Sequence, residues 1–215
     1  MKIMINDESD LSDYEEDDLK ILEDEYNSDN ESEACECEGN CSGSDSTRWN
    51  RNIPIKVNVF LWRAMLNKLP SKVNLDMRGF DVDSILCPIC LGDLKMVNHS
   101  FFNCVLAKDL WHLLAKWWEM DIPVCGNFAD WFHWLDSLHV PIKVWLVLEG
   151  VGGTLMWSIW NFCNSLIFSS CPPKKEVLWD SIVSQSFLWI LSRNPSRKFS
   201  WIGWLKNLVT TITST

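Results

Sequence analysis

Hydrophobic and polar positions divide the chain into an acidic first part and a longer second part with helical periodicity. Residues 1–48 hold many Asp, Glu, Ser and Asn and few apolar side chains, a composition typical of disordered segments. From Ile53 onward, apolar residues recur at intervals of three and four, which predicts amphipathic helices. The predicted fold class is therefore all-α, preceded by a disordered acidic leader at residues 1–48.

Turn and capping residues divide the first helical half into predicted elements. One helix follows Pro54 and ends before Pro70, because proline suits the start of a helix and not its interior. Ser71 is the predicted N-cap of a short helix that Gly79 stops. A further helix is expected over residues 97–120, where apolar positions again follow helical spacing.

Residues 121–215 predict a second helical region. An apolar stripe covers residues 128–138, and further helices are expected near residues 177–190 and 201–209. Between them, residues 142–169 are almost entirely apolar, and the glycines at 150, 152 and 153 predict a bend between two helices.

The apolar run at residues 142–169 is long enough for a membrane span to be considered. Glu149 interrupts it, and polar residues such as Ser158 and Asn161 recur on one side. This pattern favours helices packed within a folded domain, so we expect no membrane association.

Charge is distributed unevenly along the chain. The net charge is -10, but residues 1–48 hold 17 acidic and 3 basic residues, a net of -14, which leaves +4 for the remainder. The acidic leader is a candidate contact for a protein partner. The start of the chain turns acidic at once and resembles no signal peptide, so we expect a nuclear or cytoplasmic protein whose nine cysteines are thiols or metal thiolates.

The strongest candidate chemistry is the spacing C-x2-C-x8-H-x4-C formed by Cys87, Cys90, His99 and Cys104. Three thiolates and one imidazole at short spacing predict a tetrahedral Zn2+ site. Four protein ligands leave no open position for a substrate, so the site is expected to be structural and not catalytic. The alternatives are four incidental residues, or a site that uses His112 in place of one of them.

Basic residues accompany tryptophans just before this motif. The candidate nucleic-acid contacts are Arg51, Lys56, Arg63, Lys68, Lys72 and Arg78, and Arg48 also falls in this stretch. Cations beside Trp49 and Trp62 suit phosphate contact and base stacking. The alternative is a solvated helix face around buried tryptophans.

Residues 49–119 resemble the zinc-binding domain of plant LINE-type (non-LTR) reverse transcriptase proteins. The motifs that carry the resemblance are Trp49, Ile53-Pro54-Ile55-Lys56-Val57, Phe60-Leu61-Trp62-Arg63, Leu69-Pro70-Ser71, Arg78-Gly79, Cys87-Pro88-Ile89-Cys90, His99, Phe101-Phe102-Asn103-Cys104 and Leu110-Trp111. Ser100, Val105 and Cys163 depart from the family pattern, and Cys163 replaces an arginine that could contact phosphate.

The resemblance implies a zinc-binding domain at residues 49–120, followed by a helical C-terminal region at 121–215. It implies an accessory domain of an RNA-directed DNA polymerase, and no polymerase domain precedes it here, so we expect no enzyme activity. The expected function is a non-catalytic, retrotransposon-derived zinc-binding module with residual RNA or DNA binding. The alternative is a structural or protein-interaction module.

Overall fold

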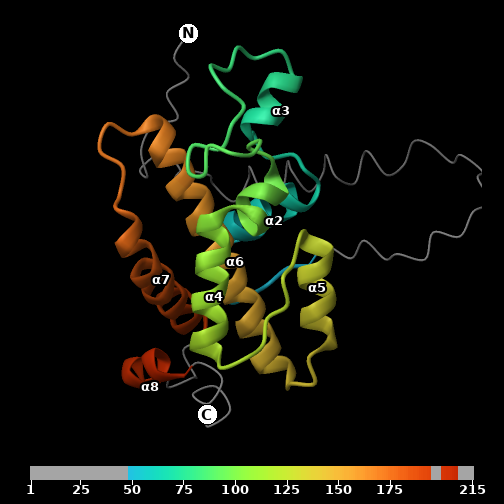
Figure 1. Ribbon diagram of the computed structural model, residues 1–215. Helices are drawn as coiled ribbons and strands as arrows, with labels where there is room; N and C mark the ends of the chain where they lie inside the picture. Colours follow the sequence, from blue (N-terminus) through green and yellow to red (C-terminus); the bar gives the residue numbers. More distant parts are fainter. Residues whose placement is uncertain (1–47, 195–199, 208–215) are drawn as a thin grey trace, which may run out of the picture. The chain divides into compact units, whose positions relative to one another are not determined.

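Helices make up the regular structure of the described residues, 48–194 and 200–207 of this computed structural model (Figure 1). Within these ranges there is no strand, only an isolated antiparallel bridge between Leu86 and Leu94. The all-α fold class predicted from the sequence is confirmed. The elements are α2 (Ile55–Met65), α3 (Lys72–Met77), the π-helix η1 (His99–Asn103), α4 (Val105–Trp118), α5 (Phe128–Ser137), α6 (Ile142–Phe168), the 3-10 helix η2 (Lys175–Val177), α7 (Leu178–Arg193) and α8 (Trp201–Lys206).

Two predictions lie wholly or partly outside the described residues. Disorder of the acidic leader concerns residues 1–48, of which only Arg48 is described. The last predicted helix, residues 201–209, is described only as far as residue 207.

Several predicted helix ends are confirmed by their capping groups. The Ser71 side chain accepts a hydrogen bond from the backbone N–H of Asn74 at 3.2 Å, which satisfies a free donor at the start of α3. Gly79 follows α3 with φ of 79°, a left-handed conformation that glycine adopts at little cost. Helix α2 begins directly after Pro54, as expected.

Helix α6 is the central element of the described unit. Helices α2, η1 and α7 all pack against it, and Figure 1 draws α4 in front of it. Val147, Leu148, Val151, Leu155 and Ile159 on α6 are completely buried. Helix α5 is tied to α6 by the Trp145 indole N–H, which donates to the carbonyl of Leu135 at 3.0 Å.

The predicted division of this run into two helices at the glycines is wrong, because residues 142–168 form one continuous helix, α6. The glycines serve close packing instead. A Cβ on Gly152 would lie 2.5 Å from Cζ2 of Trp131, and one on Gly153 would lie 2.8 Å from Cδ1 of Leu61. Glycine therefore lets α5 and α2 approach the α6 backbone more closely than any side chain allows.

Helix α6 is also the one helix among the described residues that is long and apolar enough to cross a membrane. Its most apolar window is 72% buried inside the unit. The core helix of a folded domain meets the same criteria of length and hydropathy, and packing against α2, η1 and α7 accounts for the apolar surface of α6.

Most of the fourteen tryptophans build the core. Two of them, Trp49 and Trp201, are exposed, five are buried and seven are half-buried. Trp131 lies at the centre of one cluster, with ring centroids 4.5 Å from Trp111 and 5.1 Å from Trp134. Each buried aromatic ring removes a large apolar area from water, so the tryptophans supply much of the energy that holds the helices together.

Candidate metal centre and basic surface

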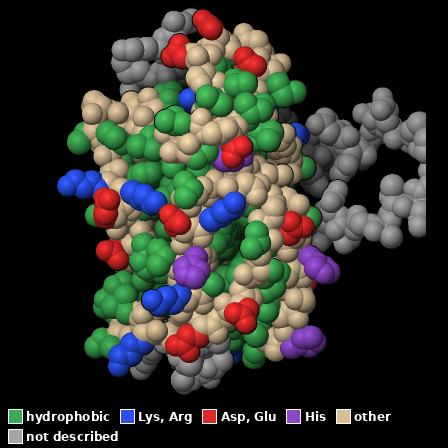
Figure 2. All heavy atoms as spheres, viewed as in Figure 1, with side chains coloured by type: hydrophobic (Ala, Val, Ile, Leu, Met, Phe, Trp, Pro, Cys, Tyr) green, Lys and Arg blue, Asp and Glu red, His purple; other side chains and the backbone are tan. Residues whose placement is uncertain are grey.

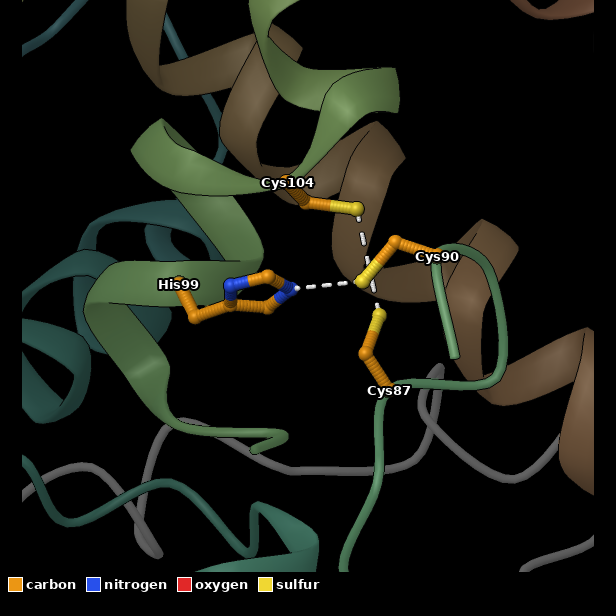
Figure 3. Close-up of side chains that lie close together, drawn as sticks. All are labelled: Cys87, Cys90, His99 and Cys104. Atoms are coloured by element: carbon orange, nitrogen blue, oxygen red, sulfur yellow. Dashed lines mark hydrogen bonds between the residues drawn. The ribbon is translucent and has the colours of Figure 1, made fainter. Parts of the chain in front are cut away.

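Two of the predicted ligands lie in a tight turn between α3 and η1. The turn is closed by backbone hydrogen bonds from the Cys87 N–H to the Asp93 carbonyl at 2.8 Å, and from the Leu91 N–H to the Cys87 carbonyl at 3.0 Å. The bridge between Leu86 and Leu94 holds the base of the turn. These contacts fix Cys87 and Cys90 with their sulfur atoms pointing to the same side (Figure 3).

The other two ligands are set by the π-helix η1. The Cys104 N–H donates to the His99 carbonyl at 2.7 Å, so the two residues are joined by a hydrogen bond across five positions and not four. Cys104 itself has extended backbone angles and is the N-cap of α4. The wide turn brings both side chains towards the two cysteines of the preceding turn (Figure 3).

The four ligand atoms lie within 4.8 Å of one another. The sulfur atoms of Cys87 and Cys104 are 3.8 Å apart, and His99 Nε2 is 3.4 Å from the sulfur of Cys90. A tetrahedral zinc ion with ordinary bond lengths separates two thiolate ligands by about 3.8 Å, and a thiolate and an imidazole by about 3.6 Å. The donor set and its spacing therefore fit a zinc ion.

The carboxylate of Asp93 lies near the imidazole of His99. Its Oδ2 lies 3.6 Å from Nδ1 of His99, too long for a hydrogen bond but close enough for electrostatic attraction. A proton on Nδ1 facing this carboxylate leaves Nε2 with a free lone pair towards the sulfur atoms. This arrangement is common for histidines that bind metals.

Hydrogen bonding between Cys104 and Cys87 lets the pair share one proton. Within this contact the pKa of one thiol falls and the pKa of the other rises, and either sulfur atom can be the donor. A metal ion replaces the shared proton by a stronger attraction for both sulfur atoms.

Three of the four ligands are shielded from solvent. Cys87 and Cys104 are 0% and 1% exposed and His99 is 4% exposed, whereas Cys90 is half-buried. His112, the competing ligand considered from the sequence, is exposed on α4 and outside the cluster. Four protein ligands match a structural site better than a catalytic one, which keeps a coordination position open.

The predicted basic residues lie mainly along and around α2. Lys56 and Arg63 are seven residues apart, so they lie on the same face two helical turns apart, and both are exposed. Lys68 follows α2 and Arg51 precedes it, while Lys72 is the first residue of α3 and Arg78 is its C-cap. Among the described residues, none of these six cations has a carboxylate within 4.0 Å.

Aromatic rings accompany two of the cations on this surface. The Lys56 ammonium lies 5.8 Å from the ring centroid of Trp157, and the Lys68 ammonium lies 6.0 Å from that of Trp62. Residues 48–75 contain no Asp or Glu. By contrast, Figure 2 shows a face where α4 lies, on which basic side chains alternate with acidic and hydrophobic ones.

Arg48 does not belong to this surface, although the sequence groups it with the other bases. Its guanidinium pairs with Asp136, lies 3.8 Å from Oε1 of Glu149, and sits 4.4 Å from the ring centroid of Phe132. Those contacts tie the segment before α2 to α5 and α6. Cys163 is 1% exposed in the core, so no phosphate contact is possible at that position.

Sequence reasoning missed two residues beside the metal centre. Asp93 was visible as an acid near the motif, but its approach to His99 depends on the fold of the turn. Lys95 is 2% exposed in the same turn, and no local signal distinguishes a buried lysine from the exposed ones around it.

No curated protein and no solved structure matches the chain. The family match begins inside the predicted leader and ends within α4, so the predicted domain boundaries at residues 49 and 120 stay predictions. The plant LINE-type origin predicted from the sequence stays a prediction. Residues 26–111 match the model of the family described as zinc-binding in reverse transcriptase, which confirms the predicted resemblance to a reverse-transcriptase zinc-binding domain.

Proposed function

We propose that the described unit is a non-catalytic module in which Cys87, Cys90, His99 and Cys104 hold one Zn2+ and the surface around α2 binds nucleic acid. The observation that carries this proposal is the group of four ligand atoms within 4.8 Å of one another in a segment that matches a zinc-binding family. Zinc in such a site supplies folding energy and not chemistry, because the ligands fill its coordination shell.

The nucleic-acid role is supported by exposed cations without acidic partners. Lys56, Arg63 and Lys68 are free to attract phosphate groups, and Trp62 offers a partly exposed ring for base stacking. Phosphate contacts and base stacking do not distinguish one base from another, so binding is expected to tolerate many sequences. Stacking requires unpaired bases, so binding is expected to favour single strands.

The test is binding of the full-length, zinc-loaded chain to a fluorescent single-stranded RNA of mixed sequence at several salt concentrations. The triple variant Lys56→Gln, Arg63→Gln and Lys68→Gln removes three phosphate contacts. We expect its affinity to fall at least about tenfold at low salt, and the dependence of log affinity on log salt to flatten by about 2.

The matched control is Lys108→Gln, Lys116→Gln and Lys143→Gln, which removes the same charge from exposed positions on α4 and α6. Equal weakening in both triple variants would show only a general effect of net charge. Absence of binding by the unmodified chain at low salt would reject the nucleic-acid role.

A protein-interaction role is favoured by one specific observation. The segment that contains the metal turn exposes several apolar side chains: Met77 at 80%, Phe80 at 49%, Leu91 at 69% and Met96 at 47%. Exposed apolar groups close together are typical of protein contacts. Binding of this kind would depend little on salt, whereas binding to nucleic acid weakens steeply as salt rises.

A further inference from the structure

Lys95 is buried beside the metal turn although it carries an ammonium group. The residue is 2% exposed, and its Nζ atom is shielded from solvent without meeting hydrogen-bond geometry to any described acceptor. The described ion pairs involve Arg48, His99 and Lys175, so no described carboxylate lies within 4.0 Å of this ammonium. An isolated buried charge is costly, so negative charge from another source is needed nearby.

The backbone of Lys95 is fixed by the turn that carries the metal ligands. Its N–H donates to the carbonyl of Ile85 at 2.8 Å, next to the bridge between Leu86 and Leu94. In the chain, Lys95 comes five residues after Cys90 and four before His99. Its position is therefore set by the same hydrogen bonds that set the ligands.

The side chain of Lys95 is directed towards Cys163 on α6. Burial raises the pKa of the Cys163 thiol, and the nearby ammonium of Lys95 opposes this only in part. Cys163 is therefore a neutral thiol and does not balance the ammonium charge. Leu86 and Leu94, the paired residues of the bridge, are 39% and 40% exposed, whereas Cys87 and Lys95 beside them are buried. Because side chains alternate between the two faces of paired segments, Lys95 and the metal ligand Cys87 lie on the same, buried face of the turn.

Three thiolates and a neutral imidazole around Zn2+ carry a net charge of -1, because the two positive charges of the ion offset only two of the three thiolates. We propose that the buried ammonium of Lys95 balances this charge and thereby strengthens zinc binding. The inference rests on the zinc site of the proposed function. Lys95 would not touch the ion itself; its positive charge would lie next to the ligands and offset the net negative charge of the zinc site. Groups that contact metal ligands without binding the metal change metal affinity by about 10- to 100-fold.

A purely structural role for Lys95 makes a different prediction. If Lys95 served only as packing, an apolar side chain of similar length would leave zinc affinity unchanged. If it balances charge, the same substitution weakens zinc binding, while the metal-free protein becomes no less stable because an unpaired buried charge is gone.

The experiment compares Lys95→Met with Lys116→Met, which removes one exposed lysine from α4 and changes the net charge equally. Zinc affinity of the full-length proteins is measured by competition with a chromophoric chelator. Thermal unfolding is followed with and without zinc. For Lys95→Met we expect a dissociation constant for zinc raised about tenfold or more, with no drop in the unfolding temperature of the metal-free protein.

A dissociation constant within twofold of the unmodified protein would overturn the assignment, as would equal weakening by Lys116→Met. If metal-free Lys95→Met does not fold, Lys95→Arg decides: it keeps the charge, so tight zinc binding supports the proposal and weak binding rejects it. Failure of the unmodified chain to bind zinc would reject the zinc site itself. Normal binding by both the unmodified chain and Lys95→Met would reject only the role of Lys95.

Discussion

The knuckle loop, residues 80–98, and helix α6 lie in the same unit but bury their side chains very differently. In the knuckle loop only Cys87, Lys95 and Val97 are buried, and apolar residues such as Leu91 face solvent. In α6, sixteen of 27 residues are buried. Burial of apolar side chains accounts for the position of α6. The knuckle loop buries too few side chains for this, so its conformation depends on a few hydrogen bonds and on the four metal ligands.

Removal of the metal is expected to have the largest effect, and to affect the two regions unequally. Zinc binding in small modules contributes on the order of 10 kcal/mol, so chelation or Cys104→Ser should release the knuckle loop. We expect hydrogen exchange to speed up in residues 80–98 while the amides of α6 stay protected. Exchange is measured by mass spectrometry, with elemental analysis expected to find about one zinc per chain.

Cys171→Ser is the matched control, because Cys171 is exposed and outside the cluster. It should keep its zinc and its exchange pattern. Zinc loss in both cysteine variants, or uniform exchange of the loop and α6 after chelation, would contradict the division into two regions.

Adding a side chain at a glycine of α6 should give the next largest effect, a loss of stability in the helical core. Gly152→Ala places a Cβ 2.5 Å from the buried ring of Trp131. Overpacking costs about 1–3 kcal/mol, which exceeds the roughly 1 kcal/mol that alanine gains over glycine in a helix. We expect a lower urea midpoint and unchanged zinc content.

The same helix supplies the control for this substitution. A Cβ on Gly150 would meet its nearest neighbour, Cγ2 of Ile53, at 3.4 Å, an ordinary contact. Gly150→Ala should therefore be neutral or stabilising by up to about 1 kcal/mol. Equal stability of Gly152→Ala and Gly150→Ala would show that glycine is not needed at position 152 to accommodate Trp131.

The smallest effect is expected from Glu149, the buried acid of α6. Burial raises its pKa above 4.5, although Asn50 and Arg48 oppose the shift. The folded state therefore holds this proton more tightly than the unfolded state, and stability falls as pH rises through the raised pKa. Glu149→Gln should stabilise the protein at pH 7.5 by on the order of 1 kcal/mol and make little difference at about pH 4.

Urea unfolding at the two pH values measures this difference. Asp121→Asn changes the net charge equally at an exposed position and should show no such dependence on pH. A destabilised Glu149→Gln at pH 7.5 would mean that the charged contacts to Arg48 outweigh the cost of burial.

The sequence predicted what depends on neighbours in the chain. Ser71 could be predicted as the cap of α3 because its side-chain acceptor and the N–H of Asn74 are only three residues apart. The metal motif could be recognised because its four ligands fall within eighteen residues. The continuity of α6 through its glycines was not predictable, since the role of Gly152 depends on Trp131 from another helix. Burial of Lys95 and the internal pairing of Arg48 likewise depend on contacts that only the folded chain creates.

The place of α6 has a consequence for where a self-sufficient folding unit ends. Phe60 and Phe101, both inside the family match, pack on Trp160, and Phe60 also meets Trp157 at 5.2 Å. Both tryptophans lie some fifty residues beyond the end of that match. The segment that matches the family is therefore shorter than the unit that packs together, because aromatic side chains from further along the chain complete the core of the matched segment.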